Sequence, residues 1–130
     1  IHYVVNTFFD QSLAMIEAGG FDLIGHFDKI GHNGSHFHPG LEDEPFYRRR
    51  LLELTDAIIA SGVTVEINTK ALAEHSRLFP SPSVWPILLK AGVPIVVNSD
   101  AHYPALINAS RPEALAMLEK AATETSISTL

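Results

Sequence analysis

Side chains that can bind metal ions follow two apolar stretches of this sequence. "FDLIG" at 21–25 runs directly into His26, and "PIVVN" at 94–98 is followed closely by Asp100 and His102. Residues two apart on an extended chain point to the same side, so Asp100 and His102 can reach one ion or two adjacent ions. Imidazole with carboxylate and without thiolate suits Zn, Mn or Fe. The pattern favours a metal site over unrelated structural residues.

A carboxylate in a third apolar stretch strengthens this interpretation. The segment "VTVEIN" at 63–68 alternates between apolar and polar residues, so one face carries Val63, Val65 and Ile67 and the other carries Thr64, Glu66 and Asn68. In a parallel barrel the polar face would point into the interior or towards a site. Because a buried carboxylate without a partner is costly, Glu66 is hard to explain as a purely structural residue.

More histidines lie in the long connection that follows His26. The segment "HNGSHFHPG" at 32–40 contains His32, His36 and His38, together with glycines and a proline. These residues favour a mobile segment over the site, with the histidines as lid or substrate contacts rather than metal ligands. His75 is interpreted as a surface histidine.

The elements that must position these residues are alternating strands and helices, which is typical of an α/β fold with a parallel sheet. The spacing predicts strands at 2–5, 21–25, 63–68 and 94–100, and helices at 7–18, 44–61, 84–91 and from about residue 111. Parallel α/β folds build their sites at the carboxyl ends of the strands. The connection from His26 to about Asp43 is long enough to be functional or disordered.

The amino-acid composition limits which classes of protein this chain can belong to. The chain has 130 residues, 46% of them hydrophobic, which suits one globular unit. A net charge of −6 argues against a nucleic-acid partner. The absence of cysteine excludes disulfides and thiolate metal sites and is compatible with a reducing compartment, so we expect a cytoplasmic location. No apolar run approaches the ~20 residues of a membrane span, and no membrane partner is expected.

The segments "FDLIGHFD", "VEINT" and "VNSDAH", in this order, resemble the PHP superfamily (polymerase and histidinol phosphatase), most closely its histidinol-phosphatase branch. "IHYVV" at the start is similar to a strand of that branch. The resemblance implies a distorted, TIM-like (β/α)7 barrel with a three-metal site at the carboxyl ends of its strands. The family's first His-x-His strand has no counterpart here. We therefore expect residues 1–130 to be a single PHP-type domain, the C-terminal half of a longer chain.

The resemblance also implies roles for individual residues. The metal ligands carried over by position are His2, His26, Asp100 and His102. Asp100 and His26 would also be the catalytic residues, and Asp100 would orient the nucleophile. Substrate contacts are expected from Asn68, Lys29 and Arg77. The divalent metals (Zn, Mn or Fe) would form a multinuclear site completed by residues outside this chain.

The expected reaction is hydrolysis of a small-molecule phosphate ester, L-histidinol phosphate, in histidine biosynthesis. Three alternatives stay open at this point. The chain could be another PHP phosphoesterase or a nuclease, a non-catalytic metal-binding fragment, or an ordinary α/β domain with structural histidines. Assembly into a homo-oligomer is also open.

Overall fold

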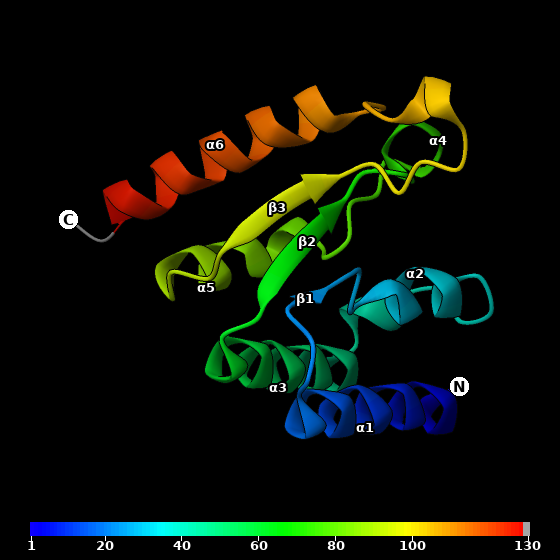
Figure 1. Cartoon of the computed structure of the whole chain (residues 1–130). Coiled ribbons are helices and arrows are strands. Elements are labelled where there is room, and N and C mark those ends of the chain that lie inside the picture. The colour runs from blue at the N-terminus through cyan, green and yellow to red at the C-terminus, as the bar shows by residue number, and fades with distance from the viewer. Residues whose placement is uncertain (129–130) are drawn as a thin grey trace.

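The computed structural model describes the backbone of residues 1–128 and the side chains of residues 1–126, and it has a mixed α/β fold (Figure 1). Its parallel sheet has the order β1-β2-β3, with strands β1 (Leu23–Ile24), β2 (Thr64–Asn68) and β3 (Ile95–Asn98). This confirms the predicted α/β class and parallel strands. Among the described residues the sheet has three strands, and its closure into a barrel stays a prediction.

Helices connect and cover the strands. The α-helices are α1 (His2–Ala18), α2 (Lys29–Ser35), α3 (Pro45–Ser61), α4 (Leu72–His75), α5 (Trp85–Lys90) and α6 (Arg111–Ser128), and the 3-10 helices are η1 (Leu41–Asp43), η2 (Pro82–Val84) and η3 (Pro104–Leu106). Helix α1 packs along α3, and α6 packs against α5 and β3, so helices flank the sheet on opposite sides (Figure 1). Within the described part of the chain, no helix is both long and apolar enough to cross a lipid bilayer.

The alternation predicted for β2 is present. Val65 and Ile67 are fully buried, and they join Leu54 and Ile58 of α3 and Leu88 of α5 in one hydrophobic core. Burial of side chains of this size contributes roughly 1.5–3 kcal/mol each. The opposite face of the strand is thereby left to carry the polar side chains.

The prediction of a strand at residues 2–5 is wrong, because these residues form the first turn of α1. Val5, Phe9 and Ile16 are buried, and the spacings of four and seven residues place them on one helical stripe. Packing of this stripe against α3 therefore overrides the β propensity of the tyrosine and valines at 3–5. His2 consequently lies at the start of a helix, not at the end of a strand.

The long connection after His26 is ordered by close packing. It contains α2 and η1, so it is not an unstructured loop. Gly31 of α2 lies so close to α3 that a Cβ atom there would come within 2.2 Å of the Tyr47 hydroxyl and 2.6 Å of Glu42 Oε1. Only glycine fits this contact without a shift, and that contact sets the separation of α2 from the start of α3.

Candidate active site at the carboxyl edge of the sheet

Strands β2 and β3 end side by side, and this brings the predicted polar residues together. Asn68 pairs in register with Asn98, and each is the last residue of its strand. Asn68 also exchanges backbone hydrogen bonds with Phe79, which returns the chain after α4 to this edge. The site is thus framed by backbone hydrogen bonds on both sides of Asn68.

Two asparagine amides partner the two carboxylates at this edge. Asn98 donates to Glu66 Oε2 at 2.9 Å, and Asn68 donates to Asp100 Oδ2 at 3.1 Å and to Glu66 Oε1 at 3.4 Å. Glu66 Oε1 would also lie 3.5 Å from a Cβ atom at Gly25, so this carboxylate reaches the end of β1. Glu66 therefore links the ends of all three strands.

Asp100 is held in an uncommon backbone conformation. Its φ of 50° is in the left-handed region, which aspartate tolerates better than most residues. Burial raises the pKa of Asp100, but the hydrogen bond from Asn68 and electrostatic interaction with Lys70, His102 and His26 outweigh it, so the pKa is lowered. The side chain is thus a carboxylate over a wide pH range.

His102 is oriented by two neighbours. Its Nδ1 lies 2.8 Å from the backbone oxygen of Asp100, and the Lys70 ammonium lies 3.0 Å from Nδ1 and 3.1 Å from Nε2. If Nδ1 carries the proton and donates it to the carbonyl, Nε2 is left to accept from Lys70. Sequence reasoning missed Lys70, although its position two residues beyond Asn68, past the end of a predicted strand, was a usable signal.

A cavity of about 220 Å³ opens beside these residues. It is lined by Lys29, His32, Asn33, Asn68, Lys70, Ala71, Glu74, His75, Phe79 and Asp100. The structure therefore brings Lys29, Asn68 and Asp100 to one cavity. Burial and electrostatic interaction with Arg77, His36 and His75 lower the pKa of His32. His75 lines the same cavity while remaining exposed.

His26 lies near this group but is exposed at the end of β1. Asp100 Oδ1 and His102 Nδ1 are 3.9 Å apart, a separation that two ligands of one ion can span when each is about 2.0–2.2 Å from it. To bind an ion through Nδ1, His102 would have to give up its hydrogen bond to the Asp100 carbonyl. Among the described side chains, His26, Asp100 and His102 do not form a triad with ligand atoms all within 4.8 Å of one another. Carboxylate and imidazole donors of this kind fit Zn, Mn or Fe in their chemistry.

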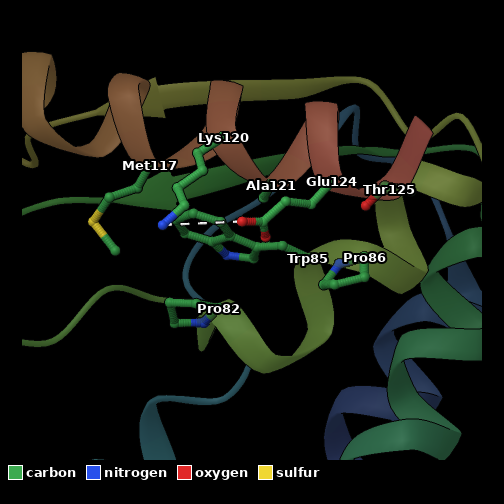
Figure 2. Close-up of a pocket in the computed structure, with 8 residues that line it drawn as sticks. All are labelled: Pro82, Trp85, Pro86, Met117, Lys120, Ala121, Glu124 and Thr125. Atoms are coloured by element: carbon green, nitrogen blue, oxygen red, sulfur yellow. Dashed lines mark ion pairs between the residues drawn. The ribbon is translucent and has the colours of Figure 1, made fainter. Parts of the chain in front are cut away.

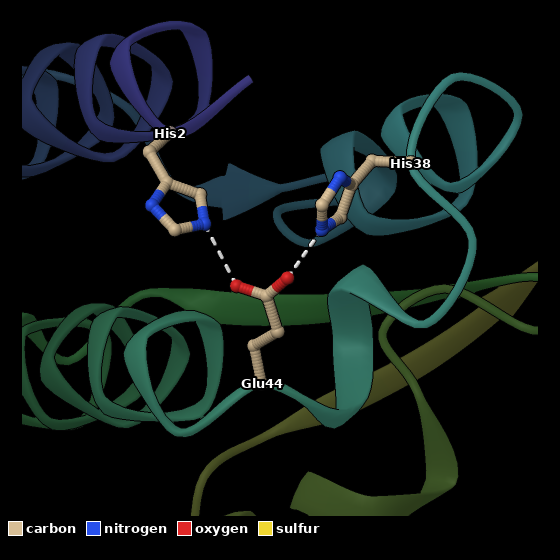
Figure 3. A group of neighbouring side chains, drawn as sticks. All are labelled: His2, His38 and Glu44. Carbon is tan, nitrogen blue, oxygen red and sulfur yellow. Dashed lines mark hydrogen bonds and ion pairs between the residues drawn. The ribbon is translucent and has the colours of Figure 1, made fainter.

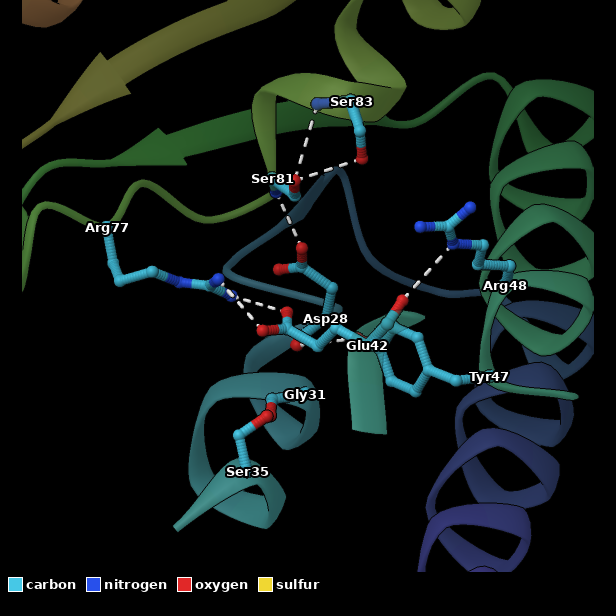
Figure 4. A network of polar contacts seen from close by, with 9 residues as sticks. All are labelled: Asp28, Gly31, Ser35, Glu42, Tyr47, Arg48, Arg77, Ser81 and Ser83. Carbon is cyan, nitrogen blue, oxygen red and sulfur yellow. Dashed lines mark hydrogen bonds and ion pairs between the residues drawn. The ribbon is translucent and has the colours of Figure 1, made fainter. Parts of the chain in front are cut away.

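Arg77 lies in a different network (Figure 4). Its guanidinium donates to both carboxylate oxygens of Glu42, at 2.9 and 2.6 Å. It lines a cavity of about 630 Å³ together with Arg48, Ser81 and Ser83, apart from the cavity that contains Asp100. The expected substrate contact of Arg77 is therefore not made from the same cavity as those of Lys29 and Asn68.

The same network contains a buried acid that sequence reasoning did not assign a role. Asp28 Oδ2 accepts from the backbone N–H of Ser81 at 2.6 Å, whereas Oδ1 is buried and has no hydrogen-bond partner within the described part of the chain. Burial raises the pKa of Asp28 to about 6, against the opposing effects of the Ser81 N–H and the Arg77 charge. Tyr47 donates its hydroxyl to the Asp28 carbonyl at 3.3 Å, which ties α3 to the segment after β1.

His2 lies apart from the strand ends, in contact with residues that the sequence did not connect to it (Figure 3). Its Nε2 is 2.7 Å from Glu44 Oε2, and His38 Nε2 contacts the other oxygen of the same carboxylate. Hydrogen bonds from His38 and His2 lower the pKa of Glu44. Sequence reasoning missed Glu44, because a contact across 42 residues depends on the path of the chain.

A third cavity, of about 430 Å³, lies between α6 and the segment formed by η2 and α5 (Figure 2). Its walls combine Trp85 and Met117 with the ion pair of Lys120 and Glu124. None of the predicted site residues lines this groove.

Comparison with known proteins supports a distant relationship to phosphatases. Over 88 residues the chain is 30% identical to a curated protein of Deinococcus radiodurans described as "Probable histidinol-phosphatase". The match covers 67% of this chain and 31% of that protein, so the chain spans about a third of the length of the relative. No family model matches the sequence.

Proposed function

We propose that this chain is part of a metal-dependent phosphomonoester hydrolase that converts L-histidinol phosphate and water to L-histidinol and phosphate. The partial similarity to a probable histidinol-phosphatase supports the phosphatase class. The parallel strands, with their polar side chains at one edge, support a place in the C-terminal part of a (β/α)7 barrel. Residues outside these 130 would complete the metal site.

The observation that carries the proposal is the convergence at Asp100. Asn68 from β2 and the segment after β3 place an amide, a carboxylate, an imidazole and the Lys70 ammonium at one point. His26 from the end of β1 is close enough to lower the pKa of Asp100 electrostatically. Carboxylate and imidazole groups from the ends of two strands, β1 and β3, are donors that suit divalent ions.

The residues of this chain have distinct roles in the proposed reaction. Asp100, His102 and His26 would hold the ions, and Asn68 would fix the Asp100 carboxylate by its hydrogen bond. Divalent ions bound there would activate water near neutral pH and neutralise phosphate oxygens. Lys29 lines the cavity and would supply positive charge to the phosphate of the substrate. This local charge matters because the whole chain carries a net charge of −6.

The test is release of phosphate from L-histidinol phosphate by the intact protein, including the residues that complete the metal site, in the presence of Mn²⁺, Zn²⁺ or Fe²⁺. Asp100→Asn keeps the preference for a left-handed backbone and removes the charge, and His26→Ala removes an exposed imidazole, so neither change should unfold the protein. Each should abolish release. Asp56→Asn on the exposed surface of α3 is the matched control for Asp100→Asn and should leave release unchanged.

A substrate panel separates the proposal from its alternatives. 4-Nitrophenyl phosphate reports a general phosphoesterase, and a single-stranded oligonucleotide reports a nuclease. If the protein hydrolyses either of these compounds faster than L-histidinol phosphate, the proposed substrate is wrong. Full activity of Asp100→Asn on L-histidinol phosphate would remove the proposed site.

A further inference from the structure

A carboxylate held between two imidazoles joins three segments of the chain at the N-terminal side of the molecule (Figure 3). Glu44 contacts His2 through Oε2 and His38 through Oε1. One ligand atom from each of the three residues lies within 4.8 Å of the other two, and this is the only triad of this kind found among the described side chains.

The local structure directs Glu44 towards the histidines. Glu44 precedes Pro45 as the N-cap residue of α3, yet its side chain makes no capping hydrogen bond to its own helix. Instead the carboxylate extends to His2 at the start of α1 and to His38, which follows α2. The His2 ring is packed on Phe46 with centroids 4.2 Å apart, which limits its rotation. The arrangement is therefore positioned by packing and not only by the ion pairs.

The triad is also open to an incoming ion. The side chains of His2, His38 and Glu44 are 55%, 39% and 28% exposed, respectively. Ligands of one tetrahedral zinc ion lie about 3.4 Å apart when each is about 2.1 Å from the metal. The 2.7 Å separation of His2 Nε2 from Glu44 Oε2 needs to widen by less than about 1 Å to reach that geometry.

We propose that His2, His38 and Glu44 form a second binding site, for a divalent transition-metal ion of the zinc class. Two imidazoles and one carboxylate are a donor set that suits Zn²⁺ and related first-row ions, and the exposure of the triad leaves a coordination position for water. A bound ion would connect the start of α1 to the start of α3 and to the segment after α2. The proposal assigns His2 to this site instead of the strand edge, and it does not depend on phosphatase activity.

Zinc titration by calorimetry tests the site. The titration is made on the metal-stripped chain carrying Asp100→Asn, so that binding of ions at the strand edge is weakened. Loss of an outer hydrogen-bond partner of a metal ligand already weakens binding by about 10–100-fold, so His38→Ala and Glu44→Gln should each weaken zinc binding at least tenfold. Zinc should raise Tm by about 5 °C or more in the Asp100→Asn protein and by less in these variants.

His36→Ala is the control, because this exposed histidine lies two residues from His38 and outside the triad. It should bind zinc as tightly as its parent. Equal affinity of the His38→Ala and His36→Ala proteins would overturn the proposal, and so would a loss confined to His36→Ala. If the variants do not fold, the imidazole ¹⁵N chemical shifts of the Asp100→Asn protein are measured with and without zinc to locate the binding site. Zinc-induced shifts at His2 and His38 support the site, and shifts confined to His32 and His36 overturn it.

Discussion

The side-chain amide of Asn68 donates to Asp100 Oδ2 at 3.1 Å, although 32 residues separate them in the sequence. This hydrogen bond crosses from the end of β2 to the segment after β3, and it opposes the effect of burial on the Asp100 carboxyl. Asn68 is itself buried, so its amide has little freedom to turn away. The charge state of Asp100 is therefore set in part by its neighbour on the adjacent strand.

The first prediction concerns this pair. In Asn68→Leu the hydrogen bond is lost, so burial of Asp100 is less opposed and its pKa should rise. A carboxyl ¹³C NMR titration measures the change. Asn33→Ala is the control, because Asn33 lines the same cavity and is not among the groups that shift Asp100. An unchanged Asp100 pKa in Asn68→Leu would contradict this prediction. It would show that electrostatic interactions, and not the Asn68 hydrogen bond, lower the pKa of Asp100.

The second prediction is a pH dependence of stability caused by Asp28. Its pKa is raised from 3.8 to about 6 in the folded protein, so between these values the folded state binds more protons than the unfolded state. The free energy of unfolding should therefore fall as pH rises from about 4 to about 6, by roughly 3 kcal/mol from this group. Denaturant unfolding at a series of pH values measures it.

Asp28→Asn is the variant that isolates this contribution, because its amide oxygen can still accept from Ser81 N–H. Relative to the parent, its free energy of unfolding should rise steadily over the same pH window and then stay constant. Asp56→Asn, on the exposed surface of α3, should follow the parent at every pH. Parallel curves for the parent and Asp28→Asn would mean that Asp28 titrates at an ordinary value.

The third prediction concerns the close contact of α2 with α3. Gly31→Ala places a Cβ atom 2.2 Å from the Tyr47 hydroxyl and should lower the free energy of unfolding by about 1–3 kcal/mol. Tyr47→Phe removes that hydroxyl, so the double variant should lose less than the sum of the single losses. A double-mutant cycle by denaturant unfolding gives the coupling energy. Additive losses would place the strain elsewhere, at Glu42.

The fourth prediction compares two arginine ion pairs. Arg77 pairs with Glu42 in a partly buried network beside Asp28, so Arg77→Met leaves two neighbouring carboxylates without their cation. We expect a loss of about 1–3 kcal/mol, between the values for exposed and fully buried pairs. Arg48→Met breaks the exposed pair with Asp43 and should cost less than about 1 kcal/mol. Equal losses in unfolding experiments would argue against a special role for the Arg77 network.

The sequence predicted the strand that organises the molecule because its alternation of apolar and polar residues is a local signal. Residues 63–68 contain β2, and the helix predicted at 44–61 matches α3 closely. Residues 2–5 were mistaken for a strand because β-branched and aromatic residues there suggest extended structure locally, whereas Val5 continues the buried stripe of α1. The error arose where tertiary packing decides between two local preferences.

Only part of the candidate site could be predicted from the sequence. Carboxyl ends of parallel strands meet at one edge, so Asn68 and Asp100 could be placed together from the order of the strands. The partner of His2 could not, since its contact with Glu44 depends on how α1 packs along α3. The ion pair of Arg77 with Glu42 could not be predicted from the sequence either, because it depends on the ordered connection after β1.

The contact of Gly31 with Tyr47 also constrains how this chain can diverge over evolution. Homologues that keep tyrosine at position 47 should keep glycine at position 31, because a methyl group and the phenol hydroxyl cannot share that space. Where position 31 has become alanine or serine, position 47 should have become smaller. Correlated substitution at these two positions would therefore mark chains that have kept this helix spacing.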